Sequence, residues 1–383
     1  MSLHDLTDFL KLSAALNIQL MAEGVGWGNI LRIITNRMPM SRPEDRAILL
    51  RVFEYLNQAY ALQRRRQGPP AILHPLRATA LLTQVSTKPQ LLDMLTELLH
   101  DKYEDLTVEA LGPELFELAE KKFRDLLNDI DPTSEWYLME RLDCLALKKP
   151  ERYYQYVGRL LDRAAQTPEL VRVKLADRLD NTLDLHIDVE DFLEEVDFFR
   201  VIFQILFPPS GSGYKPAYEH PITPPLNGAQ RLYQLFKNAI LLSLIREKHA
   251  ALDDPATCKL FEALSLASMQ ESQRIALHIM AYHEIDIERQ RSLFMEVQLY
   301  AQEGGITQIT SASINHPLDG LFTQHFDTLD LRARSKQLED LYQDKGLMLQ
   351  AAIAFVVVFM NFIHSPDYWI RGISDRGINA PET

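Results

Sequence analysis

Cysteine and alternating strand patterns are both scarce in this 383-residue chain. Its two cysteines, Cys144 and Cys258, lie far apart in the sequence. They indicate neither a disulfide framework nor a cysteine-based zinc site, and a reducing, cytoplasmic compartment is the simplest interpretation. Segments in which apolar and polar residues alternate are almost absent, which argues against a protein built from β-sheets.

Long apolar runs are scarce as well. The longest, residues 347 to 363, contains Gln350 and Asn361 and is shorter than the roughly 20 residues that a membrane-spanning helix needs. We therefore interpret it as a buried helix and expect no membrane partner. The first residues carry acidic side chains and lack a basic segment followed by an apolar core, so no signal peptide is expected.

An excess of positive charge is also missing, since the formal net charge is −13. This balance argues against broad, nonspecific binding to nucleic acid. It does not exclude an anionic substrate, because local basic clusters matter more than the total. One such cluster is the arginine run at residues 64 to 66, shortly before His74.

What the sequence does contain is a helical pattern over most of its length. Apolar residues recur three and four positions apart in segments such as 88–106 and 169–187, and this predicts an all-α fold. Residues 207 to 228 hold six of the twenty prolines and three glycines, so no helix is expected to continue through them. We predict a linker or long loop there, between a domain at 1–206 and a second helical domain of unknown role at 229–383.

Several metal-binding and acidic side chains lie at helical spacing in the first domain. His100 and Asp101 are adjacent, and a single helix through both would let them converge on one ion. Glu104 and Asp105 follow one turn later and add two carboxylates nearby. In the other segment, Asp177 and Asn181 are four residues apart and share a helix face.

Together with His74, which precedes a proline, these residues form an ordered set of two imidazoles and two carboxylates. The set is His74, His100, Asp101 and Asp177. Such a mixture suits a divalent transition ion such as Mn²⁺ or Fe²⁺, while Zn²⁺ and Mg²⁺ remain alternatives. Four protein ligands around a six-coordinate ion leave positions for water and for a substrate oxygen.

The order and spacing of this set resemble the HD superfamily of metal-dependent phosphohydrolases. More closely, they resemble the hydrolase half of the RelA/SpoT proteins, which removes the 3′-pyrophosphate from the alarmones ppGpp and pppGpp. Three stretches carry the resemblance: RRQGPPAILHP, LLHDKYEDLT and VRVKLADRLDNTLDL. They lie within residues 50 to 190, the expected core of an HD-type helical bundle.

The resemblance implies a metal site and a hydrolytic reaction. In such enzymes the four-residue set just described would hold the metal, Mn²⁺ by the habit of the family. Glu104 and Asp105 would orient or deprotonate the attacking water. Phosphoryl transfer mostly requires positioning and charge stabilisation, and a metal supplies both.

The resemblance also implies four substrate contacts. Arg65 matches the family arginine that lies nine residues before the first ligand and contacts phosphate. Arg66 stands where the family has a lysine near the guanine base. Asn181 would help to fix the nucleotide, and Asp184 occupies the polar position three residues later. An arginine fork binds phosphate oxygens in pairs, which a lysine cannot do.

Three positions depart from the family pattern. Ala71 replaces a tyrosine, Pro69 replaces an acidic residue, and Asp180 replaces the histidine before Asn181. We interpret these as changes in the nucleotide pocket rather than in the metal shell. They leave open hydrolysis of another nucleotide or phosphate ester, and also a non-catalytic nucleotide-binding regulatory module. Synthetase motifs are not recognised after residue 190, so synthesis is not expected, and homo-oligomer formation stays open.

Overall fold

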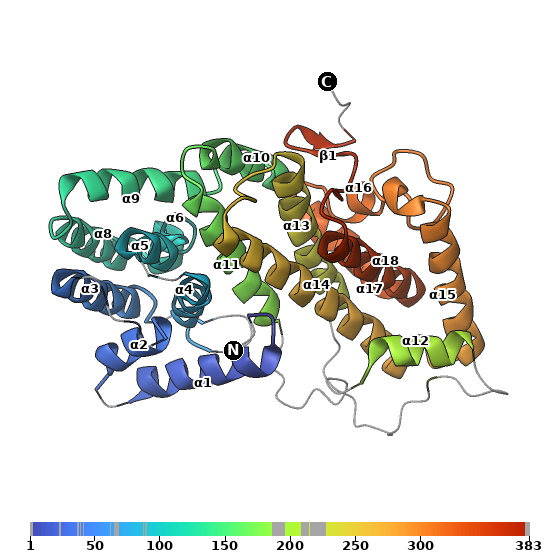
Figure 1. Ribbon diagram of the computed structural model, residues 1–383, viewed down its shortest axis with the longest axis horizontal. Coiled ribbons are helices and arrows are strands. Elements are labelled where there is room, and N and C mark those ends of the chain that lie inside the picture. Colours follow the sequence, from blue (N-terminus) through green and yellow to red (C-terminus); the bar gives the residue numbers. More distant parts are fainter. Residues whose placement is uncertain are drawn as a thin grey trace. The chain divides into compact units, whose positions relative to one another are not determined.

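The computed structural model in Figure 1 describes residues 3–22, 24–36, 38, 40, 42–61, 63–64, 69–86, 88, 90–185, 196–207, 214 and 227–379. Among these residues the regular elements are helices apart from one short hairpin, and the predicted all-α fold is confirmed. The chain divides into two compact units. The linker predicted at residues 207–228 lies almost entirely outside the described residues, and the predicted domain boundaries stay predictions.

Unit 1 comprises Met1–Glu151, Arg159–Ile187 and His249–Leu264. Its helices are α1 (Leu6–Met21), α2 (Trp27–Ile34), α3 (Pro43–Ala59), α4 (Leu73–Val85), α5 (Leu91–Leu99), α6 (Lys102–Asp105), α7 (Val108–Leu111), α8 (Pro113–Leu127), α9 (Pro132–Leu145) and α11 (Glu169–Leu183). Two helices, α10 (Tyr153–Ala164) and α14 (Pro255–Tyr282), contribute residues to both units.

Local sequence signals explain where several of these helices begin. Prolines occupy the first turn of α3, α8 and α9, where a missing backbone N–H costs nothing. Asp5 and Asp131 cap α1 and α9, and each side chain accepts a hydrogen bond from a backbone N–H three residues later.

Helix α4 is the central helix of unit 1. It packs against α1, α2, α5 and α11, as Figure 1 shows, and every side chain from Leu73 to Thr83 is buried. Burial on all faces leaves its polar residues no access to water, so each must find a partner inside the protein. Thr79 does so by donating to the Pro75 carbonyl at 2.6 Å. The same requirement applies to His74 and Arg77 on this helix.

Unit 2 comprises Arg152–Gly158, Asp188–Lys248 and Ser265–Thr383. Its elements are α12 (Phe198–Leu206), α13 (Gly228–Glu247), α15 (Ile287–Gln302), the 3₁₀ helix η1 (Gly305–Gln308), α16 (Leu321–His325), α17 (Leu331–Gln343), α18 (Lys345–His364), and the antiparallel pair β1 (Ile373–Ser374) and β2 (Gly377–Ile378).

The apolar segment near the C-terminus forms α18. By length and composition this helix is able to cross a membrane, but 67% of its most apolar window is buried inside the structure. It packs against α13, α15 and α17, and Phe355 stacks on Phe322 and Phe359. The prediction of a buried helix at residues 347–363 is therefore confirmed, and this burial is typical of a core helix.

Candidate metal centre

Three segments of unit 1 bring the predicted ligand set together. His74 comes from the first turn of α4, His100 and Asp101 follow α5, and Asp177 comes from α11. The two Nε2 atoms of His74 and His100 are 3.2 Å apart. Asp101 lies 3.2 and 3.1 Å from these nitrogens, and Asp177 lies 3.4 and 3.6 Å from them. The ligand atoms of His74, His100 and Asp101 all lie within 4.8 Å of one another and could hold one ion, and Asp177 lies beside both imidazoles.

Both imidazoles are oriented by a second contact on the opposite ring nitrogen. Nδ1 of His74 is 2.6 Å from Oδ2 of Asp180, and Nδ1 of His100 is 2.6 Å from the backbone oxygen of Glu97. An acceptor at Nδ1 places the proton there and leaves the Nε2 lone pair for another partner. Each Nε2 atom is therefore suited to bind a cation.

The cluster is buried on most sides. The side chains of His74, His100 and Asp177 are exposed by only 2, 3 and 5%, whereas that of Asp101 is exposed by 23%. Solvent therefore reaches the centre on the Asp101 side. A substrate oxygen and a water molecule would approach from there.

Electrostatics in the cluster favour positive charge at its middle. Burial lowers the pKa of His100, but the carboxylates of Asp101 and Asp177 outweigh burial and raise this pKa well above its usual range. Burial raises the pKa of Asp177, but Lys174 and the two histidines lower it well below its ordinary value. The raised pKa of His100 means that a proton on this imidazole faces the two carboxylates.

Asp177 is held by two neighbours on its own helix. Lys174 donates to its Oδ2 at 2.7 Å, and the amide of Asn181 donates to its Oδ1 at 2.5 Å. These contacts fix the carboxylate toward the histidines. Asn181, predicted to fix a nucleotide, therefore contacts a proposed metal ligand, and its role toward substrate stays a prediction.

The backbone around His100 differs from the predicted continuous helix. Helix α5 ends at Leu99, Asp101 has φ −88° and ψ 6°, and α6 begins at Lys102. This turn makes the adjacent side chains converge, so that Nε2 of His100 lies 3.1 Å from Oδ1 of Asp101. Ligand convergence comes from the interruption of the helix rather than from its regular geometry.

The two predicted catalytic carboxylates have different surroundings. Glu104 is exposed, and its Oε1 accepts a hydrogen bond from the backbone N–H of Leu147 at 3.1 Å. Asp105 is partly buried, and the Tyr60 hydroxyl donates to its Oδ2 at 3.2 Å. Burial and the neighbouring charge of Asp101 raise the pKa of Asp105 to about 6. A pKa of about 6 suits Asp105 to accepting a proton near neutral pH.

The donor set fits a divalent transition ion. Two donors at right angles around an ion roughly 2.1 Å away lie about 3 Å apart. The observed Nε2 separation of 3.2 Å and the carboxylate contacts of 3.1 and 3.2 Å are close to this value. Mixed imidazole and carboxylate donors suit Mn²⁺, Fe²⁺ or Zn²⁺ better than Mg²⁺.

The predicted substrate residues are only partly described. Arg65 and Arg66 lie outside the described residues. Asp184 is 5% exposed and forms an ion pair with Arg77 at 2.7 Å, so its carboxylate is already engaged within the protein. Its predicted substrate contact stays a prediction.

Four residues of the centre were not recognised from sequence as part of it. Arg77 and Asp180 support His74, Tyr60 contacts Asp105, and Glu97 is a fully buried carboxylate one turn before His100. Burial raises the pKa of Glu97 to about 8. The sequence pattern places Asp180 in the nucleotide pocket, whereas the structure places its carboxylate against the imidazole of His74, a predicted metal ligand. An arginine inside the mostly apolar segment of α4 is the signal in the sequence that indicates a buried ion pair.

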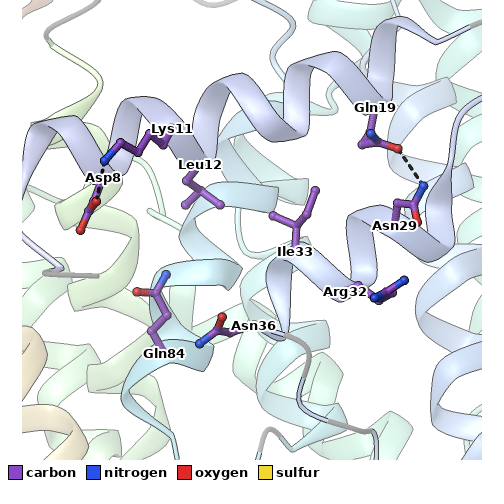
Figure 2. A pocket seen from close by; sticks show the side chains of 9 residues that line it. All are labelled: Asp8, Lys11, Leu12, Gln19, Asn29, Arg32, Ile33, Asn36 and Gln84. Atoms are coloured by element: carbon purple, nitrogen blue, oxygen red, sulfur yellow. Dashed lines mark hydrogen bonds and ion pairs between the residues drawn. The ribbon is translucent and has the colours of Figure 1, made fainter.

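A separate hollow of about 600 Å³ lies between α1, α2 and the end of α4. Figure 2 shows Lys11 beside Asp8 at one end and Gln19 bonded to Asn29 at the other. Its remaining lining residues are Leu12, Arg32, Ile33, Asn36 and Gln84. The predicted site residues are not among those that line it.

Fold and site thus define a helical protein with a candidate His/Asp metal centre. Comparison with curated proteins finds distant homology to GTP pyrophosphokinases of the RelA/SpoT family. GTP pyrophosphokinase rsh of Brucella suis biovar 1 (strain 1330) is 27% identical over 165 residues, which cover 41% of this chain and 20% of that protein. The probable GTP pyrophosphokinase of Mycobacterium leprae (strain TN) is 29% identical over 135 residues, 35% of this chain and 15% of that protein.

This chain therefore spans about one fifth or less of the length of these curated relatives. No protein-family model matches it. No solved structure matches it either.

Proposed function

We propose that this chain is a metal-dependent phosphohydrolase that removes pyrophosphate from a guanosine polyphosphate such as ppGpp. The observation that carries the proposal is the convergence of two Nδ1-anchored imidazoles with the carboxylate of Asp101, beside which Asp177 contacts both imidazoles. The names of the distant relatives support a guanosine nucleotide as the substrate.

The proposed metal ligands are His74, His100, Asp101 and Asp177. A divalent cation, Mn²⁺ in this proposal, would neutralise charge on phosphate oxygens and make water more acidic. The 23% exposure of Asp101 supports access by solvent and substrate on that side.

Asp105 is the proposed proton acceptor. In hydrolysis, an oxygen of water forms a bond to phosphorus and the bond from phosphorus to the nucleotide oxygen breaks. One proton passes from the water to Asp105, and the released nucleotide oxygen takes up a proton from solvent to become a hydroxyl. A pKa of about 6 keeps Asp105 ionised at neutral pH yet basic enough to take that proton. Glu104 would orient the water, and Arg65 and Arg66 would bind the phosphate and guanine parts.

The test is an assay of purified, Mn²⁺-loaded protein with ppGpp, followed by pyrophosphate release. Asp101→Ala should lose metal and turnover by more than roughly 100-fold, because even changes outside the ligand set cost about 10–100-fold. Asp143→Ala is the matched control, since Asp143 is 66% exposed and pairs with Lys148 at the surface. It should hydrolyse ppGpp like the unaltered protein.

Other outcomes identify the alternatives. Tight ppGpp binding without pyrophosphate release would contradict the proposed enzyme and support a nucleotide-binding regulatory module. Hydrolysis of other nucleotides but not ppGpp would keep the reaction and change the substrate. Formation of pppGpp and AMP from GTP and ATP would assign this chain the activity for which its relatives are named.

A further inference from the structure

We propose that Arg77 and Asp180 form a positioning pair for the metal centre, which holds His74 in its metal-binding orientation and connects α1 to the site. This inference rests on the proposed metal site but not on the identity of the substrate. The two residues lie on α4 and α11, and neither touches the proposed position of the reacting atoms.

Asp180 contacts both His74 and Arg77. Its side chain is fully buried, with Oδ2 at 2.6 Å from Nδ1 of His74. Oδ1 accepts a hydrogen bond from Nε of Arg77 at 2.8 Å, and Oδ2 accepts a longer one from the same guanidinium at 3.2 Å. The carboxylate is thus fixed by a two-point contact while one oxygen stays directed at the imidazole.

Arg77 is itself fixed on several sides. It is 1% exposed, and its guanidinium also forms an ion pair with Asp184 at 2.7 Å. Another nitrogen donates to the Ser13 hydroxyl at 3.1 Å, and the guanidinium carbon lies 4.8 Å from the Phe9 ring centroid. Ser13 and Phe9 belong to α1, so one guanidinium connects α1, α4 and α11.

The pair affects metal binding through the imidazole of His74. A carboxylate at Nδ1 keeps the proton on that nitrogen, orients the ring and strengthens Nε2 as a donor. A buried carboxylate without its cation partner would be unfavourable, so the two-point contact from Arg77 holds Asp180 against His74. Lysine cannot replace the planar fork that reaches Asp180, Asp184 and Ser13 together.

The experiment measures Mn²⁺ affinity of the full chain, using the electron paramagnetic resonance signal of free Mn²⁺. Asp180→Asn keeps the shape and one acceptor oxygen but removes the charge, and we expect Mn²⁺ to bind about 10–100-fold more weakly. Arg77→Lys should weaken binding in the same direction. The double variant should be little worse than the weaker-binding single variant, because both act through one contact. Asp143→Asn is the matched surface control and should bind like the unaltered chain.

The outcomes separate this inference from the proposed function. Unaltered Mn²⁺ affinity in folded Asp180→Asn would overturn the positioning pair while leaving the hydrolase proposal intact. Failure of the unaltered chain to bind Mn²⁺ would overturn both. If circular dichroism shows that Asp180→Asn does not fold, the Mn²⁺ affinity of Arg77→Lys is the test. Unaltered Mn²⁺ affinity in that variant would overturn the positioning pair.

Discussion

At the scale of residues, the environment of Asp105 governs the proposed chemistry. Its carboxylate is partly buried near Asp101, and both factors disfavour its ionised form. The Tyr60 hydroxyl opposes them by donating a hydrogen bond to the carboxylate at 3.2 Å. The charges of His74 and His100 also lower the pKa of Asp105, but the Tyr60 hydrogen bond is the contribution that can be removed without changing charge.

Tyr60→Phe should move the acid limb of the pH–rate profile to higher pH. Asp105 must be ionised to accept a proton, so activity falls as the pH falls through its pKa, which is about 6 in the protein. Loss of the hydrogen bond raises that pKa, and a contribution of about 1 kcal/mol corresponds to roughly 0.7 pH unit. The rate of ppGpp hydrolysis should be measured from about pH 5 to 8.

The control for this prediction is Tyr103→Phe, which removes a hydroxyl from a 40% exposed ring. Its acid limb should coincide with that of the unaltered protein, and all three profiles should converge near pH 8, where Asp105 is ionised. A Tyr60→Phe profile that is unmoved or shifted to lower pH would remove Asp105 from the role of base. A bound cation lowers the pKa in every variant, so the difference between them persists.

Residue types and order were enough to predict which side chains meet, but not what supports them. His74, His100, Asp101 and Asp177 carry ligand chemistry that is visible in the sequence. Arg77 and Asp180 are 103 residues apart, and their pairing exists only once α4 lies against α11. The sequence shows that Asp180 stands where the family pattern has a histidine. It cannot show that the guanidinium of Arg77 balances the charge of this buried carboxylate.

At the scale of elements, the junction between α5 and α6 determines the geometry of the centre. Apolar residues three and four positions apart over residues 88–106 predicted one helix through this region, with Glu104 one turn beyond His100 and Asp105 one turn beyond Asp101. The chain instead turns at Asp101. Lys102, just beyond the turn, is 3% exposed, forms an ion pair with Glu120 of α8 at 2.6 Å, and lies 4.4 Å from the Phe123 ring centroid. These are tertiary contacts, which the local sequence cannot reveal.

Lys102→Ala should lower the free energy of unfolding of unit 1 by about 1–3 kcal/mol. The change removes a buried ion pair, a cation–π contact and the packing of the lysine stem. Urea unfolding followed by circular dichroism would measure it. Lys121→Ala changes an exposed lysine on the same helix as Glu120 and should stay within about 0.5 kcal/mol of the unaltered protein. Equal stability of the two variants would show that Lys102 does not anchor the turn.

At the scale of the whole molecule, the two units are discontinuous in sequence. Residues 249–264 cluster with unit 1 although they follow the proline-rich stretch, and residues 152–158 cluster with unit 2. Composition indicates where a helix cannot continue, and the prolines and glycines of residues 207–228 are the basis of the linker predicted there. It cannot indicate which distant segments pack together, because compact units are defined by long-range contacts. The helical class was therefore predictable, whereas membership of each unit was not.

All proposed metal ligands belong to unit 1. Metal binding therefore tests whether the two units are stabilised independently of each other. Mn²⁺ at about 100 times its dissociation constant stabilises the bound form by roughly 2.7 kcal/mol. Hydrogen exchange should therefore slow by up to about 100-fold in α4, α5 and α11, and should stay unchanged in α15 and α18 of unit 2. Helices α10 and α14 contribute to both units and are excluded from the comparison.

The control for hydrogen exchange is Asp177→Asn, which removes one ligand charge and should abolish the effect of Mn²⁺ in every peptide. Chelation of Mn²⁺ from the unaltered protein should reverse the protection. Equal slowing in α15 and α18 would mean that the two units open together and that the metal stabilises the chain as one cooperative body. Protection confined to unit 2 would place the cation elsewhere, because buried donors such as His74 must close around an ion that they bind.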